Sequence, residues 1–211
     1  MRILVFSDVH GNIIALEKML SIEPSIGNYI FLGDAVNYGP WSNECVDLIE
    51  SLPNCIKIKG NHEEYFLSKK FSGEHPTAEA FFEFCIDNFD RNESIKKYQD
   101  RYELNGWNFC HSIQNMYVFP DSDISIDQNF VIGHSHYSFI KICNNHLLCN
   151  VGSVGQNRTF INKLDYTILD MENNSIEFKS WMYDIDKVIN EMKVRKYPKI
   201  CISYYKNKKR A

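Results

Sequence analysis

The first half of the sequence alternates three times between a short apolar segment and a segment with helical periodicity. The apolar segments, rich in β-branched and aromatic residues, are 2–7, 28–32 and 55–58, and the helical segments are 12–21, 43–52 and one that begins at His62. Apolar runs of this length are typical of buried strands, and apolar residues at intervals of three and four are typical of helices. Such alternation favours a parallel sheet with helices on its faces, because parallel strands need a crossover between them. We therefore expect an α/β fold.

The second half consists mainly of short strands and hairpins. We expect a long helix over 77–99 and a last helix over 185–194; the expected strands are 101–104, 107–110, 129–132, 139–143, 146–150, 166–171 and 175–181. No segment rich in Pro, Gly or Ser separates the halves, so we predict a single domain, 1–205, in which each half contributes a sheet. The predicted architecture is a four-layer α/β/β/α sandwich of two mixed β-sheets with flanking helices. Residues 206–211 form a basic C-terminal tail that we expect to be solvated.

Composition excludes several classes of protein. The 211 residues are 44% hydrophobic and 24% charged, which is ordinary for a globular chain and argues against disorder. No apolar run approaches the length of a membrane span, and the net charge of −4 argues against strong nucleic-acid binding. The seven cysteines have no paired spacing, so we expect reduced thiols and a cytoplasmic protein.

Polar clusters follow five of the predicted strands. They contain Asp8 and His10, Asp34, Asn61 with His62 and Glu63, His111, and finally His134 and His136. Loops after strand ends are where ligand sites assemble in α/β sheets, and these nitrogen and oxygen donors suit divalent cations. Asp8 and Asp34 could instead cap helices. Capping does not explain the spacing of His134 and His136, which face the same side of an extended segment and so indicate a metal site.

This ordered set of motifs resembles that of the calcineurin-like metallophosphoesterase superfamily. The resemblance covers residues 8–136 and implies two divalent metal ions, manganese first, with iron, zinc, nickel or magnesium as alternatives. It implies that one ion is held by Asp8, His10, Asp34 and His136, and the other by Asp34, Asn61, His111 and His134. Asp34 then bridges the two ions, which share a hydroxide that attacks phosphorus. His62 is the implied catalytic residue, which protonates the leaving oxygen or stabilises charge on it.

Two further motifs indicate the branch of the superfamily. Serine/threonine protein phosphatases read Gly-Asp-x-x-Asp-Arg-Gly where residues 33–39 read Gly-Asp-Ala-Val-Asn-Tyr-Gly, so the acidic partner of the catalytic histidine is missing. Asn37 or Glu63 is left to support His62. Residues 152–158, Gly-Ser-Val-Gly-Gln-Asn-Arg, resemble instead the small single-domain prokaryotic branch, described as phosphodiesterases or diadenosine-tetraphosphatase-like enzymes. Val151 stands where that branch commonly has Pro, and apolar residues follow Arg158, so the substrate is expected to differ.

The candidate substrate-binding residues are Arg158, Asn37 and Tyr38. Arg158 offers a planar fork to a phosphate or, equally, to loop carbonyls. Tyr38 and Trp41 could stack on a nucleobase or simply pack at the rim of the site.

Taken together, the sequence predicts a dinuclear metal-dependent phosphoesterase that hydrolyses phosphodiester or phosphoanhydride bonds of a small nucleotide-like substrate. Two alternatives stay open at this point. One is a phosphomonoesterase or nuclease with the same site, and the other is a catalytically silent binding or scaffold module. A homo-oligomer is also left open.

Overall fold

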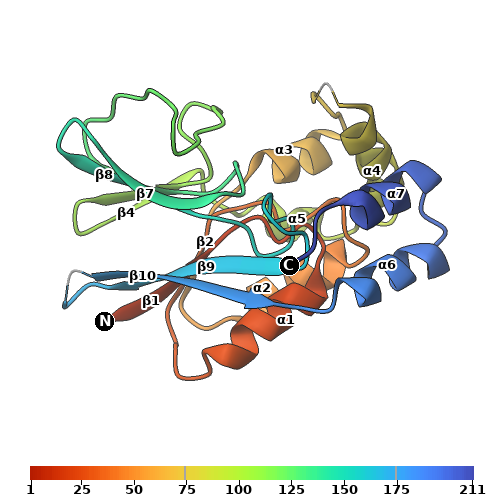
Figure 1. Cartoon of the computed structure of the whole chain (residues 1–211), viewed down its shortest axis with the longest axis horizontal. Coiled ribbons are helices and arrows are strands. Elements are labelled where there is room, and N and C mark those ends of the chain that lie inside the picture. The colour runs from red at the N-terminus through yellow and green to blue at the C-terminus, as the bar shows by residue number, and fades with distance from the viewer. Residues whose placement is uncertain (74, 174) are drawn as a thin grey trace.

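The computed structural model describes residues 1–73, 75–173 and 175–211, and its first sheet has the strand order β10-β9-β1-β2-β3 (Figure 1). The strands are β1 (Arg2–Phe6), β2 (Tyr29–Phe31), β3 (Cys55–Lys57), β9 (Lys163–Asp170) and β10 (Ser175–Met182). β1, β2 and β3 are parallel, as the βαβ pattern predicted, while β9 pairs antiparallel with β1 and β10. The expectation that each half of the chain contributes its own sheet is wrong, because β9 and β10 return from the C-terminal half to complete this sheet.

The second sheet has the order β4-β5-β6-β8-β7. Its strands are β4 (Arg101–Leu104), β5 (Trp107–Cys110), β6 (Asn129–Ile132), β7 (Ser138–Cys143) and β8 (His146–Val151). β5, β6 and β8 are parallel, and the two hairpin partners β4 and β7 are antiparallel to their neighbours. The prediction of two mixed sheets is therefore confirmed.

Alternating side chains divide the core between the layers. In β1, Leu4 and Phe6 belong to the core beneath the helices, whereas Ile3 and Val5 belong to the core between the sheets. This is the period of two that a strand buried on both faces requires. The sheets therefore pack face to face, with their strand ends gathered at one edge of the sandwich.

Helices cover the first sheet and the end of the sandwich near the strand ends (Figure 1). They are α1 (Ile13–Ile22), α2 (Ser42–Ser51), α3 (Asn61–Ser68), α4 (Pro76–Ile86), α5 (Asn92–Ile95), α6 (Ile185–Val194) and α7 (Lys199–Asn207). The helical region expected over 77–99 is divided into two helices, α4 and α5. The chain turns between α4 and α5, where the Asn43 side chain donates to the carbonyl of Asn88 (3.0 Å) and accepts from the amide of Asp90 (3.2 Å).

The outer face of the second sheet is covered by the loop that follows β5. Val118 and Ile126 of this loop pack with Ile132 and Leu148 of the sheet in a separate small core. This loop closes the outer side of the second sheet, and the predicted α/β sandwich of two mixed sheets with flanking helices is confirmed.

The C-terminal segment contains α7, which the sequence analysis did not predict. Cys201 and Tyr205 of α7 are buried, and the guanidinium of Arg210 pairs with Asp186 at 2.8 Å. The basic residues after α7 are mostly exposed, as expected of a tail, but they contact the body of the protein. The apolar residues Ile200, Ile202 and Tyr204 of α7 also recur at intervals of two, which suits a strand, so the pattern gave no clear helical signal.

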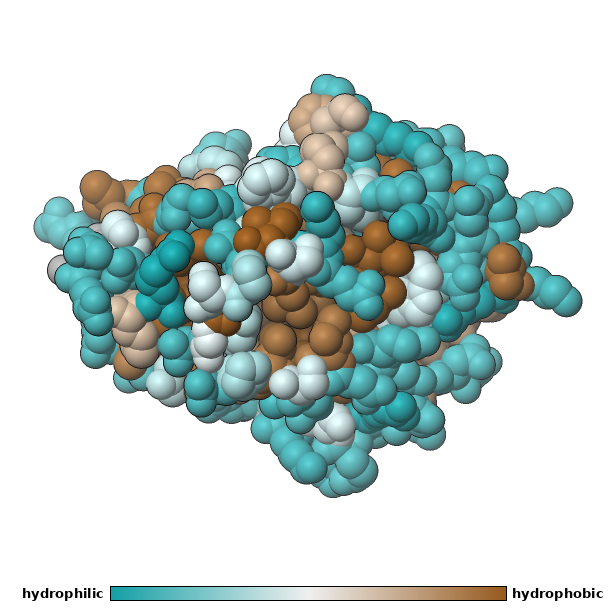
Figure 2. Space-filling model, turned by 90° about the horizontal axis from the view of Figure 1, so that it is seen from below, coloured by the Kyte–Doolittle hydropathy of each residue, from teal (hydrophilic) through white to brown (hydrophobic). Residues whose placement is uncertain are grey.

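One face of the molecule is largely hydrophilic, with hydrophobic residues gathered near its middle (Figure 2).

Within the described part of the chain, no helix combines the length and the apolar character needed to cross a bilayer.

Candidate metal centre

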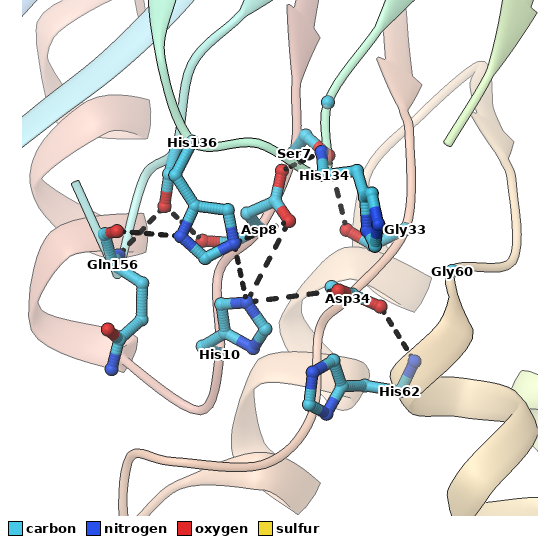
Figure 3. A network of polar contacts seen from close by, with 12 residues as sticks. Ser7, Asp8, His10, Gly33, Asp34, Gly60, His62, His134, His136 and Gln156 are labelled. Carbon is cyan, nitrogen blue, oxygen red and sulfur yellow. Dashed lines mark hydrogen bonds and ion pairs between the residues drawn. The ribbon is translucent and has the colours of Figure 1, made fainter. Parts of the chain in front are cut away.

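The predicted metal ligands follow strands whose carboxyl ends meet at one edge of the sandwich (Figure 3). They are Asp8 and His10 after β1, Asp34 after β2, Asn61 after β3, His111 after β5, and His134 and His136 after β6. All are buried except Asn61, which is half-buried. The structure brings all seven together in one continuous cluster.

The first group of donors comes from β1 and β6. His136 Nε2 lies 3.1 Å from Asp8 Oδ1 and 3.2 Å from His10 Nε2. The donor atoms of Asp8, His10 and His136 all lie within 4.8 Å of one another. One ion could therefore be reached by all three side chains.

The second group comes from α3, β5 and β6. His111 Nε2 lies 3.0 Å from Asn61 Oδ1 and 3.1 Å from His134 Nδ1. Asp34 Oδ2 lies 3.2 Å from His111 Nε2 and 3.8 Å from His10 Nε2, so one carboxylate oxygen faces both groups.

Three of the imidazoles are held from behind by a backbone carbonyl. The Nδ1 contacts are His10 with Val36 (3.2 Å), His111 with Leu32 (2.9 Å) and His136 with Gln156 (2.7 Å). A carbonyl only accepts hydrogen bonds, so Nδ1 carries a proton, and in the neutral ring Nε2 presents its lone pair to the cluster. This tautomer is the one that binds metal through Nε2.

The donor set fits divalent cations. Asp8 Oδ1 is buried without a hydrogen-bond partner, and the lone pairs of His10 and His136 face each other. An unpaired carboxylate oxygen beside converging imidazoles is costly unless a cation lies among them. Imidazole, carboxylate and amide donors suit manganese, iron, zinc and similar ions.

Protonation states are consistent with this fit. Burial, followed by repulsion from His111, lowers the pKa of His134 to about 3, which leaves its ring neutral. Although burial acts in the opposite direction, the Asp34 carboxylate raises the pKa of His111 to about 10. Without metal, a proton on His111 thus neutralises part of the cluster, and a bound cation would take the place of that proton.

Backbone strain is concentrated in the ligand residues. Asp8, His10, Asp34, His134 and His136 all have positive φ, from 49° to 67°. This left-handed conformation costs of order 1 kcal/mol or more for each non-glycine residue and persists only where the surroundings impose it. Its concentration here indicates that the fold holds these side chains in place for function.

Two glycines allow the ligand loops after β2 and β3 to touch. Gly33 has φ of 104°, and a Cβ there would lie 2.7 Å from the Cα of Gly60. A Cβ on Gly60 would lie 2.7 Å from the amide nitrogen of Asp34. Larger residues would therefore push Asp34 away from Asn61.

The predicted catalytic residue His62 is buried next to the metal ligands. Its amide donates to Asp34 Oδ1 at 2.9 Å, and its Nδ1 lies 2.9 Å from Asn37 Nδ2. The Asn37 oxygen accepts from the Tyr38 amide at 2.8 Å, so the Asn37 amide group is the donor to His62. His62 therefore keeps its ring proton on Nε2. Burial lowers the pKa of His62.

Glu63, the other candidate partner of His62, joins the loops instead. One of its oxygens accepts from the amides of Asp34 (2.7 Å) and Gly60 (2.8 Å), and the other accepts from the amide of Ala35 (2.7 Å). Its position three residues after Gly60 at the start of a helix is the signal of a capping box, which could have indicated this role.

A cleft of about 260 Å³ opens beside the predicted metal ligand Asn61 and the ring of His62. Tyr38 and Arg158, both predicted to bind substrate, line it. Trp41 does not line it and packs against the core near Arg195.

Several residues around the site were not predicted. Tyr65, Phe71, His75, Tyr117, Tyr204 and Lys208 also line the cleft. Tyr117 stacks on His134 with 4.0 Å between ring centroids. Aromatic and basic residues of this kind are common in cores and on surfaces, so their sequence carried no distinguishing signal.

Comparison with known proteins identifies the family. Residues 1–192 match the calcineurin-like phosphoesterase family. The chain therefore belongs to this family and is a metal-dependent phosphoric ester hydrolase, a class whose members act on phosphate esters.

Relatives of similar length support this assignment. An uncharacterized protein of Methanocaldococcus jannaschii is 31% identical, with 93% of each chain covered. The crystal structure of a metallophosphoesterase from Sphaerobacter thermophilus has 22% identity and a TM-score of 0.80, with 98% of each chain covered. A hypothetical protein from Pyrococcus horikoshii OT3 has 17% identity and a TM-score of 0.79, with 97% of each chain covered. The predicted resemblance to small prokaryotic metallophosphoesterases is confirmed.

Proposed function

We propose that this hydrolase uses two divalent metal ions to cleave phosphodiester or phosphoanhydride bonds of a small nucleotide-like substrate. The observation that carries the proposal is the position of Asp34 Oδ2, which faces His10 Nε2 at 3.8 Å and His111 Nε2 at 3.2 Å. A carboxylate oxygen shared by two donor groups is what a two-metal centre requires.

Each group of donors would hold one ion. Asp8, His10, Asp34 and His136 would hold the first, and Asp34, Asn61, His111 and His134 would hold the second. Manganese suits these nitrogen and oxygen donors, and iron, zinc, nickel or magnesium are the alternatives. When bound, such ions supply an activated water and neutralise charge on the phosphoryl oxygens.

His62 acts on the leaving group in this proposal. Asn37 fixes the orientation of the His62 ring through Nδ1, which leaves the proton on Nε2 free to be donated. Because burial disfavours the charged ring, His62 donates this hydrogen bond as a neutral imidazole. It would thus stabilise charge on the leaving oxygen as the bond to phosphorus breaks.

The substrate occupies the neighbouring cleft. Arg158 offers two parallel donors to a phosphate, and Tyr38 offers its ring to a planar group. A cleft of about 260 Å³ lies near the lower end of the range for small-molecule sites. This size favours a small substrate over a nucleic-acid chain.

The rival functions have less support. A scaffold module has no need of two complete donor groups or of an oriented histidine between them. A phosphomonoesterase would use the same ligands but has no need of an aromatic cleft beyond them.

All seven cysteines are free thiols, which supports a reducing compartment such as the cytoplasm.

Metal analysis combined with a substrate panel tests the proposal. The purified protein should bind about two ions per chain and hydrolyse bis(p-nitrophenyl) phosphate and dinucleoside polyphosphates faster than p-nitrophenyl phosphate. Full turnover with one ion per chain would contradict the two-metal proposal. A preference for the monoester would favour the phosphomonoesterase.

A further inference from the structure

The segment that follows the family match supplies one wall of the cleft. The match ends at residue 192, whereas Tyr204 of α7 and Lys208, which caps its C-terminal end, both line the cleft. They face Arg158, which comes from the loop after β8. This part of the cleft is therefore built by residues outside the segment that matches the family.

This wall is fixed to the metal centre. The Gln156 side chain donates to the hydroxyl of the buried Tyr205 at 2.6 Å and accepts from that of Tyr204 at 3.3 Å. The carbonyl of the same Gln156 accepts from Nδ1 of His136. A single residue thus connects α7 to a predicted metal ligand, so the position of α7 is set relative to the reacting centre.

Two cations in the cleft have no anionic partner. Neither Arg158 nor Lys208 forms an ion pair with the part of the chain that the structure describes, and the described lining residues include no Asp or Glu. Burial and then repulsion from Arg158 lower the pKa of Lys208. Two like charges that line the same cleft favour a bound anion, which reduces their repulsion.

A series of ring contacts leads from the predicted metal ligand His10 to Lys208. Ring centroids of His10 and Tyr38 are 4.9 Å apart, and those of Tyr38 and Tyr204 are 6.1 Å apart. The Lys208 ammonium group lies 4.7 Å from the centroid of Tyr204, the last ring of this series. A phosphate at the metal centre would therefore not be the group that reaches Lys208.

The opposite wall is also aromatic. The Tyr65 ring lies 5.4 Å from His62 and 5.2 Å from Phe71, measured between centroids. Such rings accept the flat face of any nucleobase. The cleft thus offers surfaces for a planar ring and a separate position for an anion.

We propose that Lys208 and Arg158 bind a second phosphate, one that is not hydrolysed, and that the substrate class is nucleotides with at least two phosphate groups. The inference rests on the proposed function, because it assumes that the hydrolysed phosphate lies at the metal centre. Lys208 and Tyr204 then determine specificity, and α7 is the element that carries them.

Calorimetric titration of the manganese-loaded protein tests the proposal with two probes, AMP and α,β-methylene-ADP, whose bridging carbon resists hydrolysis. We expect the wild-type protein to bind the two-phosphate probe about 10-fold more tightly than AMP. Lys208→Met should bring this ratio close to one, and Lys208→Arg should retain most of it.

Lys209→Met is the matched control. Lys209 carries the same charge one residue further along, but its ammonium group lies over the Phe160 ring and it does not line the cleft. The Lys209→Met ratio should stay at the wild-type value. Thermal unfolding of each variant verifies that the fold is retained.

The outcomes separate this inference from the proposed function. The role of Lys208 would be overturned if Lys208→Met and Lys209→Met reduced the affinity ratio equally. It would also be overturned if the wild-type protein bound the two probes equally well, even if bis(p-nitrophenyl) phosphate is hydrolysed. A selectivity that depends on Lys208 in a protein that hydrolyses no ester would support the binding site and refute the proposed function.

Discussion

The metal centre and the cleft beside it are in contact, yet they differ in the kind of residue that forms them. The candidate metal centre uses His, Asp and Asn at strand ends, and its predicted ligands lie between residues 8 and 136. The cleft uses aromatic and basic residues from α3, α7, the segment between α3 and α4, and the loops after β2, β5 and β8. Few residue types can hold a cation, whereas many can line a cleft. Sequence therefore indicates the first kind of site much more sharply than the second.

The same difference applies to how the two regions are held. Backbone carbonyls and the carboxylate of Glu63 hold the predicted metal ligands, whereas packing of α7 against the core and its hydrogen bonds to Gln156 hold the cleft wall. Substitutions in the centre should consequently affect catalysis, and substitutions in the cleft should affect substrate affinity.

The largest effect is expected at Asp34. Asp34→Ala removes the oxygen that faces both donor groups, so we expect kcat/KM to fall by about 10³-fold or more and the metal content to fall below that of the wild type. Steady-state kinetics and elemental analysis measure both. Asp47→Ala, at an exposed carboxylate that pairs with Arg91, is the control and should leave both values unchanged. Full turnover by the Asp34→Ala variant would contradict the assignment of Asp34 to the metal centre.

A large effect on stability is expected at Glu63. Glu63→Gln keeps one oxygen but turns an amide group toward backbone N–H donors, so at least one buried donor loses its partner. The free energy of unfolding should fall by about 1–3 kcal/mol. Urea denaturation measures the change, and Glu64→Gln, at the exposed neighbouring position, is the matched control. An unchanged midpoint would show that Glu63 does not fasten the two loops.

Asn37→Ala should lower kcat with little change in KM. Loss of the hydrogen bond to Nδ1 leaves the His62 ring free to rotate and to move its proton, and we expect a decrease in kcat of about 10-fold. Kinetics with a diester substrate provide the measurement. A change in KM alone would indicate that Asn37 binds the substrate and does not orient His62.

The smallest effects distinguish the cleft from its surroundings. Tyr65→Leu should raise KM for a nucleotide substrate by about 5-fold, since a stacking contact contributes about 1 kcal/mol or more. Trp41→Leu should change KM for the same substrate by less than about 2-fold, because Trp41 lies outside the cleft and cannot contribute a stacking contact there. Equal changes in the two variants would argue against stacking on Tyr65.

The fold was predictable where local patterns determine it. Apolar runs located the strands, and the spacing of His134 and His136 indicated two ligands after one strand. The return of β9 and β10 to the first sheet was not predictable, because strand pairing between distant segments leaves no local signal. The choice between Asn37 and Glu63 as partner of His62 also required coordinates. Both residues are polar and near in sequence, and only the path of the loops separates their roles.

The placement of α7 has a consequence for synthesis of the protein. Residues near position 8 leave the ribosome first, whereas Lys208 leaves it two hundred residues later. The predicted cation ligands, which end at His136, therefore leave the ribosome before Tyr204 and the wall that it forms. Substrate selection thus depends on a segment that can fold only after the predicted metal-binding segments have emerged.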